Sequence, residues 1–164
     1  MKRDYRTMVT FSDVLAAIDE SAPFKLQEEY DNSGLLVGEL DTPLRGTLVC
    51  MDVTEAVVAE AIGRGCNLIV SHHPLIFHGL KSLRGDTERS RAIILALRAH
   101  VGILAAHTNL DAAYGGVNYA IAQKIGLTPQ QVLAPTLSVE GGTGIGLIGT
   151  LSTGFSEEEF LIYI

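Results

Sequence analysis

Two adjacent histidines close a short apolar run near the middle of the chain. Residues 67–74 (NLIVSHHP) predict a buried β-strand that ends at Pro74, because proline has no N–H to donate to a sheet ladder. In open α/β sheets, ligands gather beyond the carboxyl ends of the strands. Two neutral imidazoles at such a position, His72 and His73, are candidate metal ligands or proton carriers.

A second polar cluster, residues 107–111 (HTNLD), follows the next predicted strand, residues 102–106. Both strands belong to a βαβαβ run, so both clusters should reach the same edge of one parallel sheet. His72, His73, His107 and Asp111 supply three imidazoles and one carboxylate, which suit Zn, Fe, Mn or Ni. Spacing alone leaves one alternative open, in which one histidine is a packed core residue and the others face solvent.

The two adjacent histidines are not expected to hold one ion together. Neighbouring side chains on an extended backbone point in diverging directions. We therefore expect His72 and His73 to serve two neighbouring ions, bridged by the Asp111 carboxylate at roughly 3.5–4 Å separation. The other two histidines are weaker candidates, because His100 lies near a helix C-terminus and His78 lies in a loop.

Local patterns predict the elements that position these clusters. Thr10 and Asp13 fit a capping box, and residues 28–34 form a polar turn in which Asp31 and Asn32 could approach the site. A buried strand over 46–53 is followed by helices over 54–65, 87–100 and 117–124. The loop after Pro74 is long enough to act as a flap and brings Lys81 and Arg84 close to the histidines.

The character of the chain changes after residue 126. Strands over 132–139 and 144–151, separated by Gly141-Gly142, predict a β-hairpin, and a capping box at Ser156 begins a helix. Residues 144–149 match G-x-G-x-x-G, but a dinucleotide site requires this motif to open a helix, whereas this stretch predicts a strand. The helix should continue beyond Ile164, so we expect the chain to be part of a larger domain.

Composition limits the class of protein. The chain has 164 residues, of which 47% are apolar and 19% charged, and this favours one folded domain. A net charge of −7 argues against general binding to nucleic acid or to an anionic membrane. No apolar segment follows Lys2, Arg3 and Arg6, and Cys50 and Cys66 fit buried thiols, so we expect a cytoplasmic protein.

Three segments together carry a family resemblance. Residues 29–38 (EYDNSGLLVG), 71–77 (SHHPLIF) and 107–111 (HTNLD) are similar, in order and spacing, to the N-terminal signatures of the GTP cyclohydrolase 1 type 2 homologues. These are also called the Nif three-like dinuclear metal centre proteins. The resemblance implies that His72, His73 and Asp111 bind two divalent ions, with His107 as a catalytic or neighbouring residue. The family's remaining ligands, a histidine and a glutamate on a C-terminal helix, have no counterpart in this sequence.

The resemblance also implies an architecture and a function. It implies an α/β fold with a mostly parallel sheet of βαβ units and flanking helices, followed by the hairpin. Residues 1–164 would form the N-terminal part of a domain that assembles as a toroidal homohexamer. The leading function is metal-dependent hydrolysis of a nucleotide-like or phosphorylated small molecule. The alternative is a non-enzymatic metal-binding or scaffold protein that works as an oligomeric ring.

Overall fold

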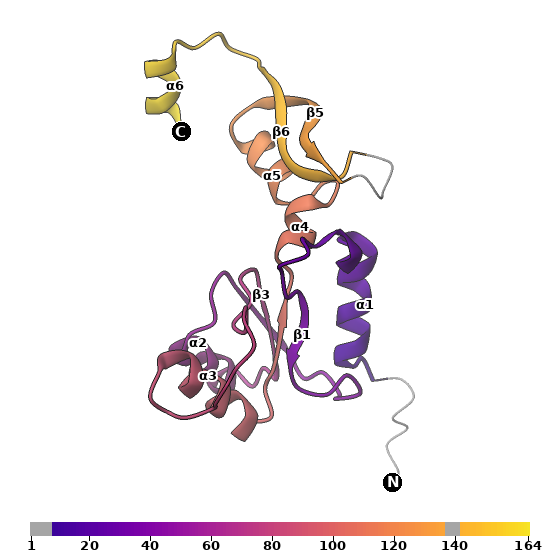
Figure 1. Cartoon of the computed structure of the whole chain (residues 1–164), viewed down its shortest axis with the longest axis vertical. Helices are drawn as coiled ribbons and strands as arrows, with labels where there is room; N and C mark the ends of the chain where they lie inside the picture. Colours follow the sequence, from indigo (N-terminus) through magenta and orange to yellow (C-terminus); the bar gives the residue numbers. More distant parts are fainter. Residues whose placement is uncertain (1–7, 137–141) are drawn as a thin grey trace.

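A four-stranded sheet lies in the larger lobe of the molecule, and helices cover its two faces (Figure 1). The computed structural model describes residues 8–136 and 142–164. The strands are β1 (Gly34–Val37), β2 (Thr47–Cys50), β3 (Leu68–Ser71) and β4 (Gly102–Ala105), in the order β1-β4-β3-β2. β2, β3 and β4 are parallel, and β1 pairs antiparallel with β4. The prediction of a mostly parallel α/β sheet is therefore confirmed.

Helices connect the strands and begin close to the predicted positions. In chain order they are α1 (Phe11–Ser21), η2 (Phe24–Leu26), α2 (Glu55–Gly63), α3 (Glu88–Arg98), α4 (Thr108–Ala112), α5 (Val117–Lys124) and α6 (Glu157–Tyr163). The Thr54 and Thr87 hydroxyls accept from the N–H groups of Val57 and Ser90, and each thereby caps a helix. The Asp13 carboxylate accepts from the Thr10 N–H at 2.7 Å, as the predicted capping box requires.

Alternate residues of the two central strands bury opposite faces of the sheet. Leu68 and Leu104 pack with Phe11 of α1 on one face, and all three side chains are fully buried. Ile69 and Ile103 pack under α2 and α3 on the other face. Because side chains alternate along a strand, the near-continuous apolar runs of β3 and β4 can fill both layers at once.

α1 lies very close to the sheet because one position of β4 has no side chain. A Cβ at Gly102 would clash with the Phe11 ring. The absence of that atom lets the buried Phe11 ring pack directly on the β4 backbone. Close packing at this end of β4 fixes the strand whose other end leads to His107.

The structure corrects the prediction that residues 46–53 form a buried strand. β2 is an edge strand, and alternate residues along it are exposed. Val49 is 76% exposed and Met51 is 58% exposed. The apolar run indicated burial, but among the described residues β2 pairs only with β3, and one face of the strand stays exposed.

The C-terminal segment forms a separate hairpin whose first strand differs from the prediction. β5 (Leu127–Pro135) pairs antiparallel with β6 (Gly144–Leu151). The predicted strand began at Val132, whereas β5 already begins at Leu127, because pairing with β6 extends the ladder through polar residues. Residues 137–139 of that predicted strand, and Gly141 of the predicted turn, lie outside the described residues. β6 confirms that the G-x-G-x-x-G match is a strand.

α6 stands apart from both the four-stranded sheet and the hairpin, at the end of an extended segment (Figure 1). The Ser156 hydroxyl and the Glu159 carboxylate make the reciprocal bonds of the predicted capping box.

Cys50 and Cys66 are free and half-buried rather than fully buried. Within residues 8–136 and 142–164, no helix combines the length and apolar character needed to cross a membrane. Lys2, Arg3 and Arg6 lie outside the described residues.

Candidate metal centre

Three histidines meet where β3 and β4 end. His72 and His73 directly follow β3, and His107 comes two residues after β4. β3 and β4 are parallel neighbours with Ser71 opposite Ala105, so their carboxyl ends lie side by side. One candidate ligand atom from each imidazole lies within 4.8 Å of the other two. The three ring centroids are 4.9, 5.2 and 5.6 Å apart.

His72 and His73 converge instead of diverging. The expectation that they could not share an ion assumed an extended backbone, but the strand ends at Ser71 and both histidines lie in a bend. The Ser71 hydroxyl donates to the His73 carbonyl at 2.9 Å and supports that bend. The premise was wrong because the proline signal was taken to end the strand at residue 74, three residues after its actual end.

Each of the three imidazoles uses its Nδ1 in a hydrogen bond to the protein. His72 Nδ1 lies 3.0 Å from the Ala106 carbonyl, which can only accept. His73 Nδ1 lies 2.8 Å from Asp52 Oδ1, and His107 Nδ1 lies 2.8 Å from Asp31 Oδ1. An imidazole that donates from Nδ1 has its lone pair on Nε2 when it is neutral. The arrangement therefore leaves Nε2 of all three rings as the nitrogen available to a ligand.

Asp111 approaches the cluster from α4 and reaches one histidine. Its Oδ1 lies 3.6 Å from His72 Nε2. Two donor atoms on one tetrahedral ion, each at about 2.0–2.1 Å, stand roughly 3.4 Å apart, so this pair has the spacing of two ligands. Asp111 is not within the same 4.8 Å group as His73 and His107. Its predicted role as a bridge between two ions stays a prediction.

The carboxylate of Asp31 orients the His107 ring through a hydrogen bond to its Nδ1. Its side chain is fully buried and also accepts from the Thr108 N–H, the Thr108 hydroxyl and the Ser33 hydroxyl. Burial raises the pKa of Asp31, but the hydrogen bonds from His107, Thr108 and the Asn32 N–H outweigh it and lower the pKa to about 2. Asp31 is therefore a fixed negative charge next to the His107 ring. The prediction that its loop approaches the site is confirmed.

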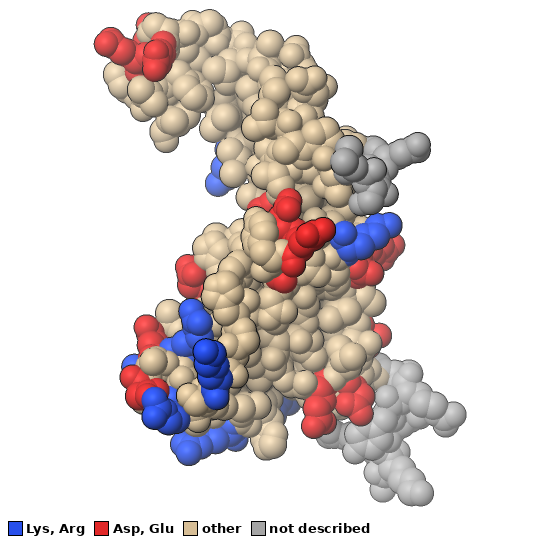
Figure 2. Space-filling model, viewed as in Figure 1, with Lys and Arg blue, Asp and Glu red and all other residues tan. Residues whose placement is uncertain are grey.

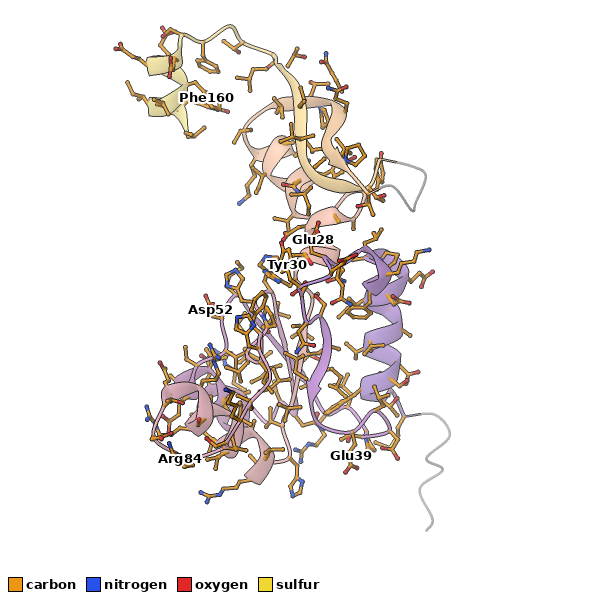
Figure 3. All side chains as sticks on the ribbon, viewed as in Figure 1. Glu28, Tyr30, Glu39, Asp52, Arg84 and Phe160 are labelled. Carbon is orange, nitrogen blue, oxygen red and sulfur yellow. The ribbon has the colours of Figure 1, made fainter. Side chains whose placement is uncertain are left out.

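Asp52 is the residue that the sequence reasoning missed. It follows β2, the third parallel strand, and reaches the site from the edge of the sheet (Figure 3). Its side chain is 69% exposed and that of its partner His73 is 47% exposed, so this is the open side of the cluster. His72 and His107 were found because ligands gather beyond the carboxyl ends of parallel strands. The same rule, applied to the carboxyl end of β2, would have found Asp52.

The remaining predicted residues lie at the margins of the cluster. The Asn32 amide donates to the Ile76 carbonyl at 2.6 Å and ties the loop after Pro74 to the Asp31 loop. In that loop the Phe77 ring lies 6.2 Å from the His107 ring, and His78 contacts Phe77 but is not in the histidine group. His100 precedes β4 and so lies near the amino ends of the parallel strands, at the opposite end of the sheet from the histidine group.

An apolar hollow opens beside His72. Its volume is about 410 Å³, and it lies along the exposed edge of the sheet. Most of its lining is aliphatic: Val49, Met51, Val70, Leu110 and Val117. A hollow of this kind suits an apolar or aromatic group held next to the polar centre.

Comparisons with known proteins agree on one family. The family model described as Duf34/NIF3 (NGG1p interacting factor 3) matches residues 9–164. A protein of Halalkalibacterium halodurans named GTP cyclohydrolase 1 type 2 homolog is 45% identical over 123 residues, which cover 75% of this chain and 33% of that protein. A Clostridium acetobutylicum protein of the same name is 31% identical over 147 residues, which cover 90% of this chain and 55% of that protein.

The solved structures agree with the sequence comparisons. The crystal structure of a Bacillus cereus protein related to NIF3 aligns with a TM-score of 0.75 and 41% identity, over 79% of this chain and 36% of that chain. The chain thus spans between a third and just over half of the length of the curated relatives described above.

Proposed function

The chain belongs to the Duf34/NIF3 family, as its sequence signatures predicted, and from that premise we propose that it binds divalent metal and serves in metal-dependent hydrolysis of a nucleotide-like or phosphorylated substrate. One observation carries the proposal: His72 and His73 converge, with His107 beside them, while each ring's Nδ1 is engaged by a protein acceptor. Metal-ligating histidines are characteristically oriented by such a bond from the second ring nitrogen.

The donor set suits a borderline transition metal rather than magnesium or calcium. Imidazole nitrogens with one carboxylate are the ligands of Zn, Fe, Mn and Ni, whereas magnesium and calcium prefer oxygen. In the proposal, His72, His73 and Asp111 are ligands of two ions. The spacing of 3.6 Å between His72 Nε2 and Asp111 Oδ1 supports a shared ion at that pair.

His107 is proposed as the proton carrier of the site. A bound ion would supply a water of lowered pKa. The His107 Nε2 can accept a proton, because its Nδ1–H is committed to Asp31. The ionised, buried Asp31 stabilises the imidazolium that results and keeps the ring oriented. Asp31 thus acts through His107 and does not itself touch the substrate.

Metal content and hydrolysis, measured on the same samples, test the proposal. We expect the wild-type chain to bind zinc, and His72→Ala and His73→Ala each to lose most of it. His107→Ala should keep its zinc and lose hydrolysis across a panel of nucleoside triphosphates. His100→Asn is the matched control, because it changes a histidine at the opposite edge of the sheet and asparagine tolerates the positive φ of that position.

Two results would contradict the proposal in different ways. Equal zinc content in the wild type, His72→Ala and His73→Ala would contradict the proposal of a metal centre at these histidines. Loss of zinc in His107→Ala would make His107 a ligand and leave the proton-carrier role without support.

A second candidate function is an oligomeric metal-binding scaffold, and a specific observation favours it. Several apolar side chains of the hairpin and α6 are exposed: Leu133 63%, Leu161 64%, Ile162 86% and Ile164 67%. Exposed apolar side chains in such number favour association, and a toroidal homohexamer is part of this proposal. Zinc binding without hydrolysis, together with a defined oligomer in light scattering, would favour the scaffold.

A cytoplasmic location belongs to the same proposal, supported by two free thiols.

A further inference from the structure

Two hollows lead away from the metal centre on the side of His73, and one residue lines both. The first, of about 310 Å³, is lined by His73, Asp52, Thr54, Glu88 and Arg89 among others. The second, of about 490 Å³, is lined by the loop before α3 and the first turn of that helix, again including Arg89. The shared residue places the two hollows next to each other, and the first of them reaches the candidate metal centre at His73. We refer to them as the first and second compartments of a groove.

The first compartment is rich in hydrogen-bond acceptors. Asp52 uses Oδ1 to hold His73, and within residues 8–136 and 142–164 its Oδ2 has no hydrogen-bond partner. Glu88 adds a second carboxylate. Two carboxylates repel a phosphate but accept hydrogen bonds from hydroxyl groups. This part of the groove therefore suits a neutral, hydroxyl-bearing portion of a ligand.

The second compartment carries unpaired positive charge. Arg84 is neutralised by Asp86 at 2.7 Å. Lys81 and Arg89 also line this compartment and have no ion-pair partner among residues 8–136 and 142–164. Thr87 and Ser90 place the N-terminal turn of the 11-residue helix α3 at the same surface, where the helix dipole favours an anion.

The charge of this segment differs from that of the whole chain. Residues 78–91 hold four of the 12 basic residues and two of the 19 acidic ones, in a chain with net charge −7. Figure 2 shows Lys and Arg side chains gathered over the part of the lower lobe that holds α3 and the preceding loop. Figure 3 places Arg84 in this region and Asp52 between it and Tyr30.

Hydrogen-bond acceptors lie near the histidines and cations lie beyond them, so we propose that the two hollows form one substrate channel. Its second compartment, lined by Lys81 and Arg89, binds the phosphate of a sugar phosphate or nucleoside phosphate. The hydroxyl-bearing sugar lies along Asp52 and Glu88, and the reacting group lies at the histidines. This inference rests on the proposed function and adds where the sugar and the phosphate of the substrate bind. Arg89, shared by both compartments, sets the distance between sugar and phosphate.

Binding of ribose 5-phosphate and of ribose, measured by calorimetry on zinc-loaded and on chelator-treated chain, tests the inference. We expect the wild type to bind ribose 5-phosphate at least about tenfold more tightly than ribose, because charge-assisted hydrogen bonds to phosphate are strong. The Lys81→Ala/Arg89→Ala double variant should lose that preference and keep its zinc. Arg98→Ala is the control, because it removes an exposed arginine from the last turn of the same helix.

Each outcome separates this inference from the metal proposal. Equal ribose 5-phosphate binding by the wild type and the double variant overturns the phosphate site, whatever the zinc content. Equal loss in Arg98→Ala also overturns it, because net charge alone would then account for binding. A wild type that binds no zinc, yet prefers ribose 5-phosphate through Lys81 and Arg89, upholds the phosphate site and refutes the metal centre.

Discussion

The part of the molecule built on the four-stranded sheet (the sheet lobe) and the part that contains β5, β6 and α6 (the hairpin lobe) bury their apolar side chains very differently. Leu68, Ile69, Ile103 and Leu104 of the central strands are fully buried. β5, by contrast, contains no buried residue, and α6 contains none either. The difference lies in topology: β3 and β4 each have two neighbouring strands and helices on both faces, whereas each strand of the hairpin has, among the described residues, only the other strand as a neighbour. Contacts with α4 and α5 and the packing of Ile145 against the small cluster around Leu26 add little burial.

The chemistry follows the same division. All the candidate site residues follow, or directly precede, strands of the sheet lobe, where buried neighbours fix the backbone at the strand ends. Rigid strand ends are what a metal centre requires, since ligands must keep their geometry before an ion binds. The hairpin lobe offers apolar surface instead, which suits contact with other protein.

The largest expected effect is a difference in the free energy of unfolding between two substitutions that each shorten an aliphatic side chain to alanine, one in each lobe. Ile103→Ala removes a fully buried side chain from β4 and should cost about 2–5 kcal/mol. Leu133→Ala removes a side chain that is 63% exposed in β5 and should cost no more than about 0.5 kcal/mol. Urea denaturation followed by circular dichroism measures both. Similar losses would mean that the hairpin has a core of its own.

Metal should sharpen the comparison further by stabilising only the sheet lobe. Zinc at a hundredfold excess over its Kd should add about 2.7 kcal/mol to the free energy of unfolding. Hydrogen exchange should slow at the ends of β3 and β4 and stay unchanged in β5 and β6. His72→Ala serves as the control and should show neither effect. Equal protection of the hairpin would indicate that the two lobes unfold together.

Acid should weaken the sheet lobe through Asp31. Its pKa of about 2 lies below the ordinary 3.8, so its contribution is complete above about pH 4 and is lost as the pH falls toward 2. The contribution is on the order of 2 kcal/mol for a fully buried carboxylate. In chelator, the difference in stability between the wild type and Asp31→Asn should shrink over that range. A constant difference would show that the charge of Asp31 is not what stabilises the fold.

The smallest effect on stability is expected at α6. Ile162 is 86% exposed, so Ile162→Lys should change the free energy of unfolding by no more than about 0.5 kcal/mol. The same change should reduce self-association, because it places a charge in an exposed apolar surface. Light scattering over a dilution series measures this. A wild type that stays monomeric at every concentration would contradict the expectation.

Sequence reasoning located the central strands and helices because their signals are local. Proline, glycine or cap residues lie beside many of the boundaries, and the runs of β3 and β4 are almost entirely apolar. Thr108–Ala112 was predicted only as a polar cluster, because a five-residue helix has too few turns for a periodic pattern. The antiparallel direction of β1 depends on pairing with β4 some seventy residues later, which no local pattern encodes.

The candidate site was predictable in part for the same reason. His72, His73 and His107 could be placed together because parallel strand ends share an edge. Their hydrogen-bond partners could not be assigned, because Asp31 and Asp52 become neighbours of the histidines only through the strand order β1-β4-β3-β2. Edge exposure of β2 was likewise missed, since it depends on which strand has no further neighbour.

The position of β4 also orders events during synthesis. β4 is central in the sheet but is the last of its four strands to be made. His107, which follows β4, comes 76 residues after its partner Asp31 in the chain. A chain that is still emerging from the ribosome presents Asp31, His72 and His73 before the strand that unites them exists. The three-imidazole cluster therefore cannot assemble on the nascent chain until most of the sheet has been translated. The full donor set of the proposed metal centre, which includes Asp111 of α4, is therefore available only after all four strands and α4 have been made.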